Sequence, residues 1–298
     1  MDSGGCSGLR TADRGAVRGH VDRAGPAARP RSGSRMNRLG HILQIGLAGL
    51  AYLLILGPTI VVVIVSFSAG ETFAFPPPGL SLRWFVEFFA ADNMTGAFLF
   101  SLRVGATAAI AATVLATLAA RFVVRQRGAT SGALQSLFTA PLVFPAIILG
   151  LALLLFYRTI NVGGPAGLVL AHVLIGMPYA FRLVLASLQS FNLTLEEAAQ
   201  SLGAGPIRTF FLVTLPIIWP GILSGGLFAF IVSFGELNVA LFLTGPGYTT
   251  LPIEIFGYLQ FPGRQLIIAA ASTMQVALII VLALTIERLV GLARVGRS

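Results

Sequence analysis

The sequence predicts an all-α polytopic membrane protein with six transmembrane helices. Of its 298 residues, 56% are hydrophobic and only 10% are charged, and the mean hydropathy is +0.87. A soluble globular protein could not cover its surface with so few charges. Six apolar runs are long enough to cross a bilayer, which takes about 20 residues of helix. The expected spans cover residues 42–67, 95–120, 134–156, 166–188, 217–243 and 264–286.

The first segment, residues 1–35, consists mainly of Arg, Gly, Ala, Ser and Pro. Without large apolar side chains it cannot offset the entropy of ordering, so we expect a disordered, Arg-rich cytoplasmic tail. The alternative is an arm that binds anionic lipid or a partner protein. Met36, Asn37 and Arg38 directly precede the first apolar run and read as a natural start, so the sequence leaves open whether residues 1–35 are translated.

Residues 36–94 should form the first span and an external loop. The run 42–67 has no charged residue and is longer than the ~7–15-residue core of a signal peptide, so it should remain in the membrane. We expect Pro58 to kink it. The charged and proline-rich stretch 68–93 is the expected loop, with an interfacial helix at 82–89.

The next three spans carry few polar features. The second is rich in Ala and Thr, small residues that allow close helix packing in lipid. Its Arg103 should snorkel outward, and the alternative is that it faces a polar path through the protein. The third span contains Pro141 and Pro145 but no charge. We expect His172, in the fourth span, to be packed and hydrogen-bonded rather than a ligand.

Glu236 is the only acidic residue that the sequence places well inside a span. A carboxylate at a helix centre costs about 2.5–3.5 kcal/mol by insertion scales, so it should face the protein interior or a wet cavity. Two uses remain open, contact with a ligand ammonium group and a structural hydrogen bond or ion pair. On a helix, Phe234 and Asn238 would point away from Glu236, which makes them weaker site candidates.

Between the fourth and fifth spans, a polar interruption covers residues 189–216. Thr194 and Glu197 have the spacing of a capping box, and the pattern after them predicts a short amphipathic helix over about 195–202. Gly203 supplies freedom at the helix end, and Pro206 suits the first position of a second short helix. The prediction is helix, glycine break, helix.

Charge sets the topology. The chain has a net charge of +9, and all 20 of its basic residues are Arg. Eight lie within the first 38 residues and most others flank apolar runs, so we attribute the charge to membrane topology and not to nucleic-acid binding. Six spans place both termini on one side together with Arg121, Arg125 and Arg127. By the positive-inside rule that side, which includes the short tail 291–298, is cytoplasmic.

Composition also restricts the chemistry. A chain without Lys has no Walker A phosphate loop, so any ATP hydrolysis must come from another chain. Cys6 is the only cysteine and forms no internal disulfide, and the three histidines lack metal-ligand spacing, so no cofactor is expected. An intramembrane protease is disfavoured because the segment around Ser224 has the wrong spacing and no histidine is paired with it.

The polar interruption also carries a family resemblance. Glu197-Ala198-Ala199, then three residues, Gly203, nine residues and Val213-Thr214-Leu215-Pro216 resemble the EAA signature of permease subunits in type I binding-protein-dependent ABC importers, which have Ile or a similar residue at the Val213 position. The resemblance implies the ABC transmembrane type-1 fold, with its core at 95–290. In that family this segment is the coupling helix, which sits in a cleft of the ATPase subunit. The resemblance therefore assigns ATPase docking to Glu196, Glu197, Ala198, Ala199, Gly203, Leu215 and Pro216.

Two further stretches, 233–247 and 75–85, resemble spermidine/putrescine permeases of the second permease subfamily. In those relatives an acidic pair is frequent near the Glu236 position, whereas this chain has Gly235 beside it. The resemblance implies a polyamine permease of the bacterial inner membrane, with Glu236 on the substrate path. Its implied partners are a second permease, two ATPase subunits and an external binding protein.

Other solutes remain open, namely thiamine, ferric iron, phosphonate or an opine-like compound. A secondary transporter or channel is a further alternative, but it would have no reason to carry the coupling signature. Transport that persists without ATP would reveal it.

Overall fold

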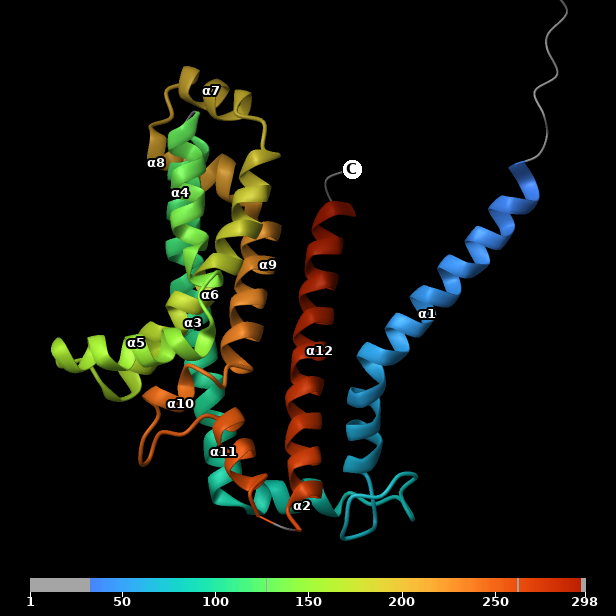
Figure 1. The fold of residues 1–298 in the computed structure, drawn as a ribbon. Coiled ribbons are helices and arrows are strands. Elements are labelled where there is room, and N and C mark those ends of the chain that lie inside the picture. Colours follow the sequence, from blue (N-terminus) through green and yellow to red (C-terminus); the bar gives the residue numbers. More distant parts are fainter. Residues whose placement is uncertain (1–32, 127, 262, 296–298) are drawn as a thin grey trace, which may run out of the picture. The chain divides into compact units, whose positions relative to one another are not determined.

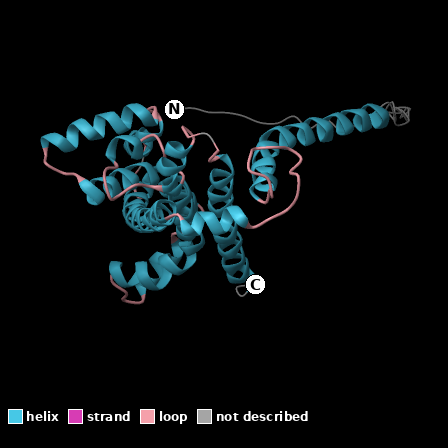
Figure 2. Cartoon of the chain, turned by 90° about the horizontal axis from the view of Figure 1, so that it is seen from below, coloured by secondary structure: helices cyan, strands magenta, loops and turns pink. Residues whose placement is uncertain are grey.

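The computed structural model describes residues 33–126, 128–261 and 263–295. Every named element in these ranges is helical, and the only β-structure among them is two isolated bridges (Figure 2). The chain divides into two compact units, residues 1–55 and 56–298. The expected disordered tail falls largely on residues 1–32, which lie outside the described ranges. Its last residues, 33–35, belong to the first helix instead.

The helix α1 (Gly33–Ser66) contains the first span and runs across the boundary between the two units. Its apolar part, Gly40–Ser66, is long and apolar enough to cross a membrane. Large apolar side chains such as Ile42, Leu54 and Ile55 are about two-thirds exposed, as expected of a lipid-facing helix. The first expected span is therefore present as a helix.

In the second unit, α3 (Asp92–Val124), α6 (Gly164–Gln189) and α9 (Leu215–Phe234) pack against one another (Figure 1). The contact face of α3 is a row of small residues. This close packing supports the prediction made from the Ala-rich second span. The buried members of the row are Ala108, Ala109, Ala112, Ala116 and Ala120.

A second core lies at one end of this unit, where α2 (Arg83–Ala90) and α11 (Leu251–Tyr258) meet the start of α12 (Gln265–Val295). The short helix expected at 82–89 is present. Its Trp84 and Phe88 are buried, and Trp84 Nε1 donates a hydrogen bond to the carbonyl of Ser68 at 3.0 Å. The loop that follows α1 is thus fixed to the helix bundle.

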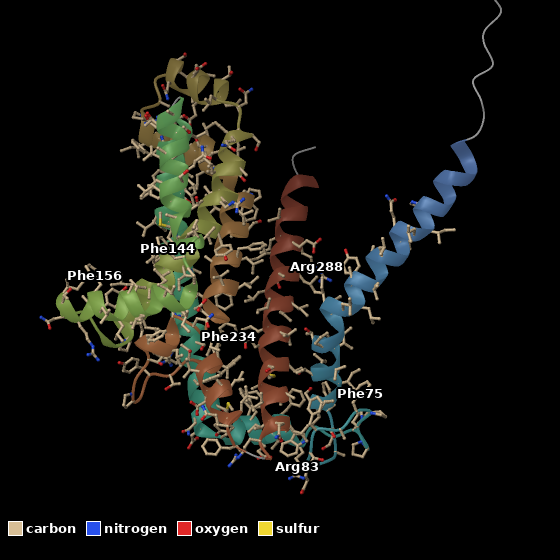
Figure 3. All side chains as sticks on the ribbon, viewed as in Figure 1. Phe75, Arg83, Phe144, Phe156, Phe234 and Arg288 are labelled. Carbon is tan, nitrogen blue, oxygen red and sulfur yellow. The ribbon has the colours of Figure 1, made fainter. Side chains whose placement is uncertain are left out.

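The third expected span is not one straight helix. It is divided into α4 (Ala129–Thr139), a 3-10 turn (Ala140–Leu142) and α5 (Ala146–Thr159), and the two long pieces are bent by 93°. Pro145 has no N–H to continue a helical ladder, and it disfavours helical geometry at the preceding Phe144, labelled at the bend in Figure 3. The described residues therefore contain five candidate spans, or six if this bent pair is one span.

The fifth expected span also has different ends. Its helix begins at α8 (Pro206–Thr209), continues through a π-helical turn, η2 (Phe210–Thr214), and ends with α9 at Phe234. The candidate span Pro206–Phe234 has 29 residues, about 43 Å at 1.5 Å per residue. The chain then breaks before α10 (Ala240–Leu243), so Glu236 lies beyond the span and not within it.

Candidate functional site

The polar interruption 189–216, named the coupling segment below, lies at the end of the bundle opposite α2 and α11 (Figure 1). It contains α7 (Thr194–Ser201), a break and then α8, as predicted. The predicted capping box is wrong. The helix starts one residue earlier than expected, so Thr194 is its first residue and Leu193 is the N-cap. The side chain that accepts a hydrogen bond at this end is Asn192, whose Oδ1 lies 3.1 Å from the Thr194 N.

Gly203 ends α7 in a conformation that favours glycine, with φ +88°. Its N–H donates to the carbonyl of Gln200 at 2.9 Å, and the N–H of Ala204 donates to the carbonyl of Ala199 at 3.0 Å. These bonds satisfy carbonyl groups at the helix end that otherwise lack partners. The glycine break therefore has the physical cause that the sequence suggested.

The predicted docking residues do not share one face. Glu197, Ala198, Gly203 and Pro216 are exposed, and Ala199 and Leu215 are half-buried. Glu196 differs from the others because it is only 7% exposed and is the only buried residue of α7. Its side chain points into the protein.

Glu196 contacts two other helical elements. Its Oε2 accepts a hydrogen bond from Arg125 Nη2 at 2.7 Å, which also makes an ion pair, and its Oε1 accepts a hydrogen bond from the Thr214 hydroxyl. Arg125 is the C-cap residue of α3, and Thr214 is the last residue of η2. Three segments far apart in sequence meet at this carboxylate.

One turn before Arg125, Arg121 makes a parallel set of contacts. Its guanidinium lies 4.2 Å from the ring centroid of Phe210, and its Nη2 donates to the carbonyl of Pro206 at 3.5 Å. Sequence reasoning treated both arginines only as topology signals and missed these contacts. Their spacing of four residues, which places them on one face of a helix, was the available signal.

Exposed apolar side chains surround a hollow of about 300 Å³ beside the glycine break. Leu202 is 89% exposed and Leu212 is 64% exposed, and both line it together with Arg208. Ile207, on the neighbouring turn, is 75% exposed. So large an apolar surface next to polar residues is typical of a protein-interaction site.

Glu236 lies in the turn between α9 and α10 and is half-buried. Its Oε1 accepts a hydrogen bond from the Val239 N–H at 3.0 Å, so the carboxylate closes the turn that leads into α10. Because the turn is not helical, the helical directions expected for Phe234 and Asn238 do not apply. Phe234, labelled in Figure 3, is buried. It stacks on Phe230, with ring centroids 5.3 Å apart.

His172 and Arg103 have separate environments. His172 is 1% exposed and its Nδ1 lies 2.7 Å from Ser233 Oγ, so it is packed and hydrogen-bonded as expected. Arg103 is exposed and lines a pocket of about 430 Å³ beside the start of α3, together with Asp92 and Glu254. Partial burial raises the pKa of the Glu254 carboxyl. No group of three or more potential metal ligands occurs in the described part of the chain.

Comparisons with known proteins agree with this architecture. The putrescine transport system permease protein PotI of Escherichia coli is 39% identical over 215 residues, which cover 70% of this chain and 76% of PotI. The spermidine/putrescine transport system permease protein PotC of Haemophilus influenzae is 29% identical, over 70% of this chain and 81% of PotC.

A crystal structure of a bacterial ABC transporter that imports the acidic polysaccharide alginate matches with a TM-score of 0.65. The match covers 86% of this chain and 98% of that chain at 16% identity, and it shows the shared fold alone. The family model of the binding-protein-dependent transport system inner membrane component matches residues 112–293. The chain therefore belongs to the family of inner membrane components of binding-protein-dependent transport systems.

Proposed function

We propose that the chain is one permease subunit of an ATP-driven importer and that its solute is a polyamine, passed on by an external binding protein. The observation that carries the solute class is the 39% identity to a permease named for putrescine transport, over 70% of this chain. The protein itself performs no chemistry. ATP is hydrolysed by separate subunits.

The coupling segment supports the ATPase partner. Its outward face combines the carboxylate of Glu197 with the small side chain of Ala198 and the exposed apolar Leu202. A surface of this kind accepts a protein at close range, because small side chains let the partner approach and exposed apolar groups gain from burial. We infer that two ATPase subunits bind here and at the matching segment of a second permease.

An external binding protein completes the assembly. A second structure of the alginate transporter contains a periplasmic protein with bound alginate pentasaccharide. The transporter chain that matches in it is 16% identical to this chain. ATP-driven closure of the ATPases would push on α7 and change the bundle from inward-open to outward-open, so that solute enters from the binding protein.

The position of the coupling segment implies the orientation. An ATPase subunit binds on the cytoplasmic side, where ATP is available. Arg121 and Arg125, which the positive-inside rule also assigns to that side, lie at the same end of the bundle as α7. We therefore place both termini in the cytoplasm and the loop with α2 outside, in the bacterial inner membrane. We retain 36–94 as the first span with its external loop, 95–290 as the core and 291–298 as a tail.

Glu236 remains our residue for the substrate path, now at the outer end of α9. One of its oxygens holds the Val239 N–H, and a carboxylate has enough lone pairs for an ammonium group as well. Asp92 and Glu254 outnumber Arg103 in the pocket that the three residues line, and we place this pocket on the external side. Negative charge there would attract a cationic solute and raise its local concentration before it enters the permease.

The test is uptake in the native host. Cells that lack this gene should lose ATP-dependent uptake of labelled putrescine or spermidine, and the full-length chain should restore it. Unlabelled polyamines should compete, whereas thiamine, ferric iron and phosphonate should not. Competition by one of those solutes would overturn the polyamine assignment alone, and uptake that survives ATP depletion would overturn the importer class.

A further inference from the structure

We propose that Glu196, Arg125 and Thr214, named the latch below, transmit movement of α7 to α3 and α9. The proposal rests on the proposed function, in which an ATPase moves α7. It gives Glu196 a role different from that of Glu197 beside it. Glu197 faces outward, whereas the Glu196 side chain is 9% exposed and is bound on both oxygens within the chain.

The need for a latch follows from how α7 is attached. Glu196 is the only buried residue of this eight-residue helix, so no fully buried apolar side chain anchors α7 to the bundle. At its C-terminal end, α7 is followed by the glycine break at Gly203. Without a further contact, a push on α7 would reach the bundle only through the backbone at the two ends of the helix.

A buried carboxylate is suited to that task. An ionised group out of water is strongly destabilised when its partners are removed, so separation of Glu196 from Arg125 or Thr214 is costly. Arg125 keeps 46% of its side chain exposed, while Glu196 is enclosed. The three elements therefore have to move together, and the contact resists pulling as well as pushing.

The latch connects α7 to two of the three helices that form the central bundle. Arg125 follows the last residue of α3, and Thr214 directly precedes α9. Arg121 adds a contact from α3 to the start of α8, through Pro206. Because α3 and α9 pack on each other and on α6, a displacement at α7 reaches the whole central bundle.

The experiment uses the complex isolated from the native host through an affinity tag on the full-length chain and reconstituted in liposomes. Two variants break the latch outside α7, Arg125→Gln and Thr214→Val. Arg125→Lys and Thr214→Ser are the matched controls, because they keep the charge and the hydroxyl. Three quantities are measured: ATPase subunit retained per permease, ATP hydrolysed, and putrescine taken up per ATP.

Both latch variants should retain the ATPase at the wild-type ratio and still hydrolyse ATP, while uptake per ATP falls about tenfold, within the range of energetic coupling between protein sites. The matched controls, Arg125→Lys and Thr214→Ser, should keep most of the wild-type uptake per ATP. Glu197→Gln should instead reduce the retained ATPase. Wild-type uptake per ATP in Thr214→Val, or a fall that only follows the loss of retained ATPase, would overturn the latch. A wild-type complex without any ATPase would overturn the proposed function itself.

Discussion

Gly221 of α9 lies so close to Ser187 of α6 that a Cβ atom added to the glycine would stand 2.6 Å from the serine Cβ. The same crossing brings Gly225 to within contact of Ala180, where an added Cβ would lie 3.2 Å from the Ala180 Cα. Close backbone approach of this kind replaces the hydrophobic effect as the main source of helix association in lipid.

We predict that Gly221→Ala destabilises the protein by about 1–3 kcal/mol through overpacking of the α6–α9 contact. The measurement is the thermal unfolding of the purified protein in detergent. Gly132→Ala is the matched control, because a Cβ there meets nothing within 4 Å and Ala favours a helix over Gly. Equal unfolding temperatures for the two variants would contradict the close crossing.

Gly203→Ala should weaken ATPase binding. The φ of +88° costs an L residue about 1–2 kcal/mol, so the end of α7 would shift. Retained ATPase per permease is the readout, with membrane insertion checked in parallel. Gly205→Ala is the control, since Gly205 has an ordinary φ of −67° and open space around it. A normal complex with Gly203→Ala would contradict the role of this bend.

Glu236→Gln separates the two uses of this side chain. The amide oxygen can still accept the Val239 N–H, so thermal stability and assembly should not change. A lost charge-assisted hydrogen bond to an ammonium group is worth about 1.5–3 kcal/mol, so the KM for putrescine uptake should rise about 10- to 100-fold. Unchanged uptake would exclude the substrate role, and loss of assembly would indicate a structural one.

Glu254 should make stability depend on pH. Partial burial raises its pKa in the folded protein above the ordinary 4.5, so the folded state holds the proton more tightly than the unfolded state does. Stability from this group is therefore present at low pH and is lost as the pH rises through the folded pKa. The unfolding temperature should fall as the pH rises from about 4 to about 7, and it should fall less in Glu254→Gln, which has no proton to lose at this position. Glu71→Gln, at a side chain 79% exposed, is the control.

The sequence by itself determined the helical class and the approximate place of five of the six expected spans, because about 20 apolar residues satisfy their backbone in lipid by forming a helix. It also determined the order of helix, glycine break and helix in the coupling segment, since Gly203 and Pro206 act through local backbone geometry. These features depend on neighbours within a few positions, which a sequence displays directly.

Only the tertiary structure decided the rest. The third span bends by 93° at Pro145, whereas Pro58 lies inside the continuous helix α1, so the presence of a proline did not tell a break from a continuous helix. Glu236 lies outside the fifth span because the chain turns after Phe234 to reach α10. Glu196 and Glu197 look equivalent in the sequence. They differ because Arg125 and Thr214, 71 and 18 residues away, converge on one of them, and such long-range contacts leave no local pattern to read.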